Sequence, residues 1–250
     1  MDFIDDICVY TKTNFQDHLQ DLWQVFIELR QANLVLNPEK YHFARLKLPL
    51  LGHIVSCDGL QVDPEKINKL VEMRLPRNTT EIRSFLGLAS YYRRFVEHFA
   101  KIADPIIKMT RKDANVCWDT AAQISFNTLK QALTTAPVLA YPNSKKPFIL
   151  TTDASSLALG AILTQEDENK LEHVIAYASQ TLNQAQASYS ATHLEALAVI
   201  WAVNKFRHYL YGREFKLRTD HSALVSILKS TKPLTGILAR WAAFLQEYKF

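Results

Sequence analysis

The sequence predicts an α/β (α+β) protein whose C-terminal part is a mixed sheet flanked by helices. Three β-prone segments, 148–153, 160–164 and 174–178, follow one another with short turns, as antiparallel strands do. An apolar helical segment over 191–206 and another strand over 215–219 come next, an order typical of a layered sheet-and-helix architecture. The section before Lys145 is rich in helix caps instead, so we place a domain boundary near residue 145.

The composition is that of a globular protein. The chain has 250 residues, 48% apolar and 22% charged, which excludes disordered, collagen-like and membrane classes and allows one large or two modest domains. Its three cysteines are too few and too scattered for a disulfide framework or a zinc site, which indicates a reducing compartment. The apolar run 196–203 is too short to span a bilayer, and the acidic start is unlike a signal peptide. We predict an intracellular protein, cytoplasmic or nuclear, that is neither secreted nor in a membrane.

The first elements carry acids and turn signals. Apolar residues around Asp5 and Asp6 predict a hairpin whose tip bears both carboxylates. Helical spacing of apolar residues over 19–29 predicts a helix, and 52–62 reads as a second hairpin. Asp63-Pro64 and Asn78 with Glu81 are helix starts.

The middle section is helical and basic. A helix predicted over 79–96 interleaves aromatic side chains with Arg83, Arg93 and Arg94, and Asp104 and Asp119 are expected to cap further helices. Residues 66–112 contain eleven Lys and Arg against four Asp and Glu, a net charge of +7, while the rest of the chain carries −3. Such a stretch fits either a phosphate-binding surface or an ordinary amphipathic helix.

Three acids stand out in the C-terminal part: Asp153 and Asp220 end strands, and Glu195 lies within an apolar helix. Singly, each has an ordinary interpretation as a turn residue, a helix cap and a solvated helix position. Together they favour a cation, because strand ends beside one helix converge and unpaired carboxylates in one pocket repel each other. Oxygen ligands without a His or Cys cluster favour Mg²⁺ or Mn²⁺, as in two-metal phosphodiester hydrolysis.

These residues resemble a known family. Segments 152–155, 192–198, 201–202, 205–207, 209–212 and 219–221 resemble the RNase H domain of Ty3/gypsy-type retrotransposon polyproteins. Residues 3–6 resemble the aromatic-x-Asp-Asp loop of reverse transcriptase, with Phe3 in place of the usual tyrosine. Leu51, Gly52 and His53 resemble the primer-grip hairpin, and 85–95, which includes Tyr92, resembles the thumb. The resemblance covers nearly the whole chain in the expected order.

The resemblance implies a division into the end of a reverse transcriptase palm (1–60), a thumb (61–112), a tether (113–145) and a C-terminally truncated RNase H domain (146–250). The basic stretch would grip a primer/template duplex through its phosphates. Asp153, Glu195 and Asp220 would hold two Mg²⁺ ions and hydrolyse the RNA strand of an RNA/DNA hybrid, selected by its 2′-hydroxyls and shape. His221 would assist with substrate or serve only at a helix start, and His193 is expected to have little effect on metal binding.

The resemblance also implies missing parts. A fourth RNase H acid and an upstream palm aspartate are absent from the chain, so Asp5 and Asp6 are two-thirds of a metal site, and we expect weak or no cleavage and no templated DNA synthesis without the remaining Pol segments. The leading hypothesis is a retrotransposon enzyme fragment. A catalytically inactive or domesticated nucleic-acid-binding module is the alternative, and an unrelated α/β protein would require the ordered motifs to be coincidence. The sequence does not indicate the oligomeric state.

Overall fold

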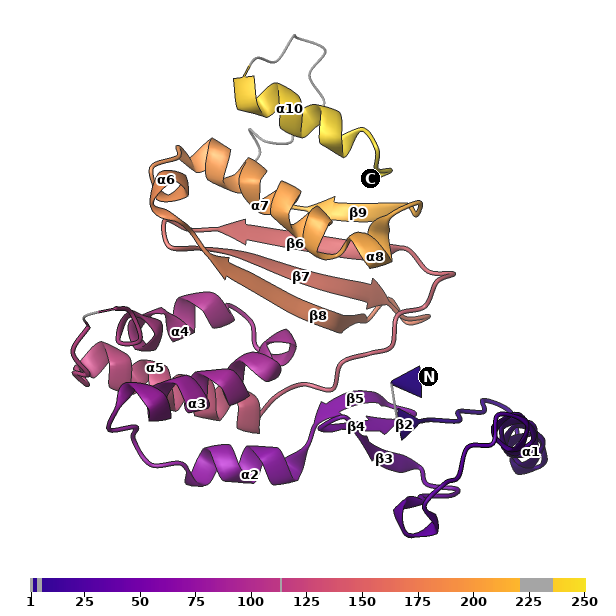
Figure 1. The fold of residues 1–250 in the computed structure, drawn as a ribbon. Helices are drawn as coiled ribbons and strands as arrows, with labels where there is room; N and C mark the ends of the chain where they lie inside the picture. The colour runs from indigo at the N-terminus through magenta and orange to yellow at the C-terminus, as the bar shows by residue number, and fades with distance from the viewer. Residues whose placement is uncertain (1, 4–5, 113, 221–235) are drawn as a thin grey trace.

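The computed structural model describes residues 2–3, 6–112, 114–220 and 236–250 and confirms the mixed α/β architecture (Figure 1). A four-stranded sheet with its helices occupies the C-terminal half. A group of helices lies against one edge of this sheet, a small three-stranded sheet lies beside that group, and a separate helix lies on the far side of the small sheet. No helix in these described ranges is both long and apolar enough to cross a membrane.

The N-terminal part contains two small sheets. β1 (Asp2–Phe3) and β2 (Asp6–Ile7) pair antiparallel as the predicted hairpin, but Asp6 lies in β2 opposite Phe3 and not at the tip, and residues 4 and 5 lie outside the described residues. The antiparallel meander of β3 (Lys47–Leu50), β4 (His53–Ser56) and β5 (Gly59–Val62) confirms the second hairpin. Between them lie α1 (Phe15–Gln31) and the short 3-10 helix η1 (Pro38–Lys40). α1 contains no buried residue, and several of its apolar side chains, Trp23 among them, are exposed.

One hydrophobic core joins the helices of the middle section, α2 (Pro64–Glu72), α3 (Thr79–Tyr91), η2 (Arg93–Phe95), α4 (Phe99–Lys108) and α5 (Thr120–Thr134). Asp63, Asn78 and Asp119 cap α2, α3 and α5 as predicted, each accepting a hydrogen bond from a first-turn amide. The predicted cap at Asp104 is wrong. Asp104 lies inside α4, 7% exposed, with Lys108 Nζ 2.7 Å from its carboxylate one turn later.

The thumb and tether predicted over 61–112 and 113–145 share this core. α5, in the predicted tether, packs on α4 and α2, and its Phe126 ring lies 4.6 Å from the Phe85 ring of α3. The boundary at 112 stays a prediction, but the two segments form one packed helical unit, here called the helical unit (residues 61–139).

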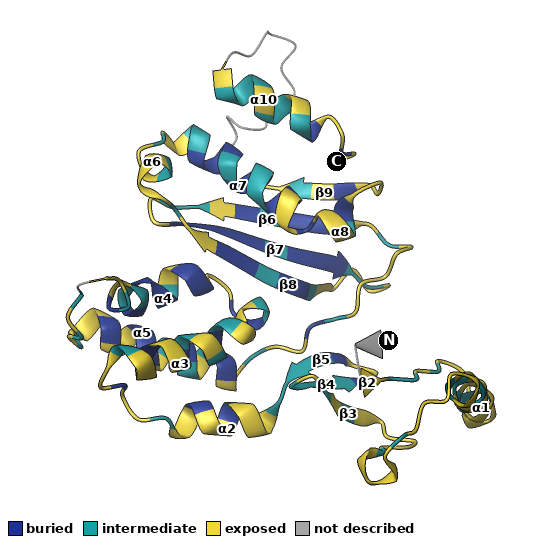
Figure 2. Ribbon diagram, in the orientation of Figure 1, coloured by how far each residue is buried: buried dark blue, intermediate teal, exposed yellow. Residues whose placement is uncertain are grey.

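The C-terminal sheet has the strand order β8-β7-β6-β9, with β9 (Phe215–Arg218) parallel to β6 (Phe148–Ala154) and the other neighbours antiparallel. β7 (Ala158–Glu166) and β8 (Glu172–Thr181) are longer than predicted. α7 (Ala191–Lys205) covers one face, with α6 (Gln184–Ala187), α8 (Arg207–Leu210) and α10 (Gly236–Leu245) nearby (Figure 1). Figure 2 shows buried residues concentrated in β6, β7 and β8 and on the inner side of α7.

The edge strand β8 is covered by the helical unit and by Ala140, the residue that follows it. Val174 and Ala140 share a backbone hydrogen bond of 2.8 Å, and the Ala100 amide donates to Ser179 Oγ at 2.8 Å. Arg93 donates to the Ser179 carbonyl. These contacts occupy two backbone carbonyls and one hydroxyl of an edge strand, where open backbone groups could pair with another chain.

Candidate functional site

The fold brings the three predicted acids toward one end of the sheet. Asp153 is the next-to-last residue of β6, and Asp220 lies two residues after the end of β9. β6 and β9 run parallel with Thr151 opposite Arg218, so their C-terminal ends lie at the same edge. Glu195 lies in the second turn of α7, which packs on β6. The convergence expected from strand order and helix position is therefore present in the backbone.

Glu195 has the most perturbed environment of the three. It is 8% exposed, and its Oε2 is buried without a hydrogen-bond partner among the described residues. Burial first, then the charges of Asp220 and Asp153, raise the pKa of Glu195 from 4.5 to about 7, while a hydrogen bond from the Ala154 backbone opposes this. The order of these charges shows that Asp220 acts more strongly on Glu195 than Asp153 does.

The residues fit a hard cation chemically. All three donors are carboxylates, Asp153 and Asp220 are exposed to an incoming ion, and Glu195 keeps an unpaired buried oxygen. Across the described ranges, however, no three His, Cys, Asp or Glu side chains are close enough together to hold an ion as they stand. Burial is the main cause of the raised pKa of Glu195, and the charges of the two aspartates, which a bound cation would offset, add to it.

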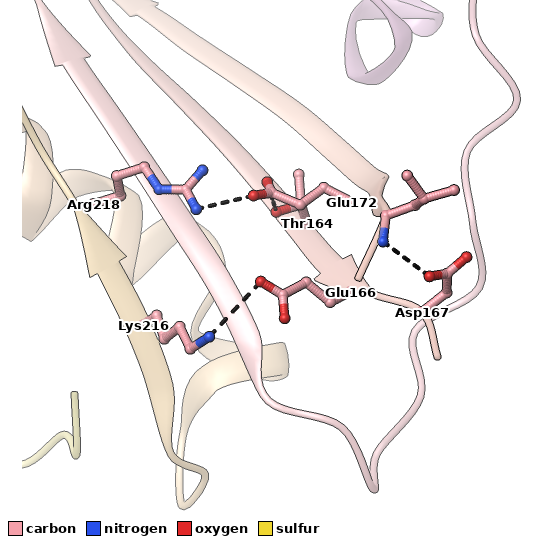
Figure 3. A network of polar contacts seen from close by, with 7 residues as sticks. Thr164, Glu166, Asp167, Glu172, Lys216 and Arg218 are labelled. Atoms are coloured by element: carbon pink, nitrogen blue, oxygen red, sulfur yellow. Dashed lines mark hydrogen bonds and ion pairs between the residues drawn. The ribbon is translucent and has the colours of Figure 1, made fainter. Parts of the chain in front are cut away.

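A polar network on the sheet holds the strand that leads to Asp220 (Figure 3). Arg218 of β9 donates to Glu172 Oε1 at 2.9 Å, and Thr164 of β7 donates to Glu172 Oε2 at 3.1 Å. Lys216 Nζ lies 3.7 Å from Glu166 Oε1. The hydrogen bond from Arg218 is the main reason that the pKa of Glu172 is lowered. The network thus ties the short β9 across β6 to the two strands beyond it.

Tyr92 requires a correction. It was predicted to bind nucleic acid, but it is 0% exposed and its hydroxyl donates to the Gly52 carbonyl. Burial is the main reason that its pKa rises to about 12. A side chain with no accessible surface cannot contact a nucleic acid, so Tyr92 anchors the turn between β3 and β4. The exposed Tyr91 donates to the neighbouring Leu51 carbonyl.

The predicted grip residues form that turn. Leu51 and Gly52 both have positive φ, 47° and 68°, and Leu51 is 37% exposed. His53 Nδ1 lies 2.9 Å from the Leu51 carbonyl, and its ring stacks on Phe95 at 5.7 Å. Desolvation is the main reason that the pKa of His53 is lowered. Contact of Leu51, Gly52 and His53 with nucleic acid stays a prediction.

The three predicted thumb arginines differ in their surroundings. Arg83 is exposed, and its Nη2 donates to the Thr110 carbonyl at 3.3 Å. Arg93 lies over the Phe99 ring at 5.3 Å as well as bonding to Ser179, and burial lowers its pKa. Arg94 lies 3.5 Å from the Ile175 carbonyl. Arg93 and Arg94 therefore join the helical unit to β8, and their predicted phosphate contacts are untested.

The remaining predicted residues are only partly described. Asp6 is exposed at the start of β2, and Phe3 lies in β1. Asp5 and His221 lie outside the described residues. His193 is half-buried, with Nδ1 2.7 Å from Ser190 Oγ at the start of α7.

One feature near Asp153 has no signal in the sequence. A hollow of about 150 Å³ next to Asp153 lies between the sheet and the residues that precede α4, Glu97 and His98. His98 has a left-handed backbone (φ 52°), and its Nδ1 lies 3.3 Å from the position that a Cβ at Gly160 would take. Only the tertiary packing of the helical unit brings these residues to the sheet.

Comparison with known proteins identifies a domain in the C-terminal part and homologues of the whole chain. Residues 143–248 match the family model described as "RNase H-like domain found in reverse transcriptase". The chain is 38% identical to the retrovirus-related Pol polyprotein from transposon opus and 39% to that from transposon 297, both of Drosophila melanogaster. It is 32% identical to the Tf2-3 polyprotein of Schizosaccharomyces pombe. The chain therefore contains an RNase H-like domain of reverse transcriptase, and its homologues are Pol polyproteins of Ty3/gypsy-type LTR transposons.

These Pol relatives are much longer proteins. The alignments cover 98% or 99% of the chain but 25%, 23% and 19% of the three relatives. The fold is also that of the foamy viral protease-reverse transcriptase in complex with an RNA/DNA hybrid, with a TM-score of 0.80 at 20% identity over 95% of the chain and 33% of that protein. Its complex with double-stranded DNA gives 0.78 at 21% identity over 95% of the chain and 50% of that protein.

Proposed function

We propose that residues 146–250 are the RNase H part of a retrotransposon Pol protein and act in hydrolysis of the RNA strand of RNA/DNA hybrids. Residues 1–60 and 61–112 would belong to the palm and thumb of its RNA-directed DNA polymerase. The environment of Glu195 carries the proposal, because a buried carboxyl with an unpaired oxygen and two carboxylates acting on it is stabilised by a divalent cation.

Asp153, Glu195 and Asp220 would hold Mg²⁺, or Mn²⁺. When bound, such ions activate water and stabilise the leaving oxygen of a phosphodiester. Asp153 and Asp220 are exposed at the strand ends, so they would lie on the side of the site that faces the nucleic acid. Glu195 is held in place by its helix and by the hydrogen bond from the Ala154 amide. The Arg218–Glu172 bond positions the end of β9, two residues before Asp220.

Several partners follow by analogy with the solved complexes and the longer relatives. We propose an RNA/DNA hybrid and a primer/template duplex as ligands, with further Pol segments completing the enzyme. The basic surface of 66–112, with Arg83 exposed on it, would hold the duplex through phosphates. Asp5 and Asp6 would belong to the polymerase metal site. An intracellular location, in the cytoplasm or nucleus, stays a prediction.

Metal binding by the chain tests the proposal without requiring turnover. Titration calorimetry with Mn²⁺ at pH 8 should show binding by the wild-type chain, weakened about tenfold or more by Asp220→Asn, since removing one anionic ligand removes a large part of the attraction. Glu168→Asn, in the exposed turn after β7, is the control and should bind like wild type. Binding that is absent, or equal in all three proteins, would contradict the proposal.

A nucleic-acid-binding protein without turnover is the second candidate. The spacing of the carboxylates in the described part of the chain favours it, since no three acids there lie close enough for a metal. Hybrid cleavage separates the two functions. An RNA strand cut only with Mg²⁺ or Mn²⁺, and left intact by Asp153→Asn, supports the nuclease, whereas salt-sensitive hybrid binding with no metal binding supports the alternative.

A further inference from the structure

A cationic and aromatic surface lies at the far end of α7 from the candidate acids. It consists of residues 205–213, from the end of α7 through α8 to the turn before β9, and is called here the α8 surface. These nine residues contain Lys205, Arg207 and Arg213, all exposed, and no acid. Twelve residues separate Glu195 from Arg207, which corresponds to about 18 Å along a helix. The α8 surface is therefore distinct from the site at the strand ends (Figure 1).

A tight turn fixes the geometry of this surface. The Tyr211 amide donates to the Arg207 carbonyl at 2.8 Å, and the Arg213 amide donates to the Leu210 carbonyl at 3.1 Å. Gly212 has φ 72°, a left-handed conformation that glycine adopts without strain. The turn thus keeps Arg207, Tyr211 and Arg213 within one short segment, with Arg207 four residues before Tyr211 and Arg213 two residues after it.

Tyr211 is presented outward although it is aromatic. It is 56% exposed, with the Arg207 guanidinium 4.8 Å from its ring centroid and the Tyr248 ring edge-on at 6.1 Å. These contacts hold the ring in place and leave more than half of its surface open. Arg213 lies 5.9 Å from the buried Phe148 ring, which likewise restrains its guanidinium.

The cations of this surface are not neutralised by their surroundings. Within the part of the chain that the structure describes, Lys205, Arg207 and Arg213 form none of the ion pairs, in contrast to Lys216 and Arg218 on β9. Glu214 follows the surface directly and pairs with Lys249 in a β-bridge, and Glu247 lies two residues before Lys249, so the three cations together with these exposed residues carry a net charge of +2.

We propose that the α8 surface binds single-stranded nucleic acid. Restrained guanidinium groups suit phosphates, and an exposed, fixed ring offers a stacking platform for a base, a combination typical of strand-binding surfaces. An unpaired strand is required because a base within a duplex is already stacked and does not reach the Tyr211 ring. An acidic peptide would satisfy the cations but would make no use of the ring.

Fluorescence anisotropy with labelled oligo(dT) in EDTA tests this independently of metal binding and cleavage. Arg207→Glu/Arg213→Glu should weaken binding about tenfold or more, and the slope of log K against log salt should become shallower by about 1.4, for two lost phosphate contacts. Tyr211→Ala should weaken binding about fivefold or more through lost stacking. Lys12→Glu/Lys40→Glu makes the same charge change at exposed positions of the N-terminal part and is the control.

Three outcomes would overturn the assignment: binding by the double arginine variant within twofold of wild type, an equal loss in the lysine control, or loss of poly-glutamate binding with oligo(dT) binding intact, which would assign the surface to an acidic protein. Arg207→Gln/Arg213→Gln, checked by circular dichroism, provides the same comparison if the glutamate variant does not fold. Because no divalent ion is present, failure here leaves the proposed nuclease untouched.

Discussion

Replacing Glu195 by glutamine should stabilise the protein at alkaline pH. The pKa of Glu195 is about 7 in the folded chain and near 4.5 when the carboxyl is exposed on unfolding. Between these values the folded state binds more protons than the unfolded state, so the free energy of unfolding falls as pH rises from about 4.5 and is lowest above about 7. Each unit of pKa difference corresponds to about 1.4 kcal/mol, so the ionised Glu195 costs up to about 3 kcal/mol at pH 8.

Glutamine keeps the shape and the oxygen that accepts the Ala154 hydrogen bond but cannot ionise. Glu195→Gln should therefore unfold at higher temperature than wild type at pH 8, by about 2–4 °C for each kcal/mol gained, and its advantage should fall to about a quarter of this at pH 5. Thermal unfolding followed by circular dichroism in EDTA across this pH range measures both. Glu168→Gln, at an exposed turn, should match wild type throughout.

The refuting result is specific. If Glu195→Gln is no more stable than wild type at pH 8, or if its advantage is the same at pH 5, the carboxyl is not held in a costly ionised state. Addition of Mg²⁺ at pH 8 should raise the unfolding temperature of wild type and leave that of Glu195→Gln nearly unchanged, so the difference between the two proteins should shrink or reverse.

Three further predictions concern the framework of the site. Gly59→Ala should destabilise the chain by about 2–3 kcal/mol in urea unfolding, because Gly59 has φ 136° and a Cβ there would lie 2.2 Å from the Leu139 carbonyl oxygen. Gly87→Ala, at a position in α3 with open space around it, is the control and should be neutral or stabilising. Equal effects of the two substitutions on the free energy of unfolding would contradict this geometry. Tyr92→Phe should cost about 1–2 kcal/mol without changing affinity for a hybrid, and a change in affinity at unchanged stability would restore Tyr92 as a binding residue. Arg93→Ala should speed hydrogen exchange of the backbone amides in β8, because Arg93 donates to the Ser179 carbonyl of that strand. Arg83→Ala should leave this exchange unchanged and should reduce the slope of log K against log salt for duplex binding by about 0.9. The reverse pattern would show that Arg93 is the phosphate contact.

The sequence predicted most helices and strands because caps, turns and apolar spacing depend on residues that are close together in the chain. Asn78 and Asp119 cap helices in the structure because a short polar side chain satisfies first-turn amides. Asp104, which is followed by a proline, was predicted to cap a helix but lies inside α4. The helix continues past Pro105 because Phe99, Ala103 and Ile106 are buried in the core. Tertiary packing outweighed the local cap signal at that position.

The sequence predicted which acids form the candidate site, but it did not predict their burial or their contacts. Strand ends and helix position place Asp153, Glu195 and Asp220 near one another, whereas the burial of Glu195 depends on how α7 packs on β6. Tyr92 and Arg93 belong to one aromatic and basic run in sequence, and only the packing of 91–96 separates the buried tyrosine from the arginine that reaches β8. His98 beside Gly160 depends on contacts between distant segments.

The most direct test of the shared site is the pKa of Glu195, measured by carboxyl ¹³C NMR in wild type, Asp153→Asn and Asp220→Asn without metal. We predict a value near 7 in wild type that falls in both variants, more in Asp220→Asn than in Asp153→Asn, because Asp220 is the stronger of the two charges acting on it. A Glu195 pKa that does not change in either variant would show that the three carboxylates do not share one site.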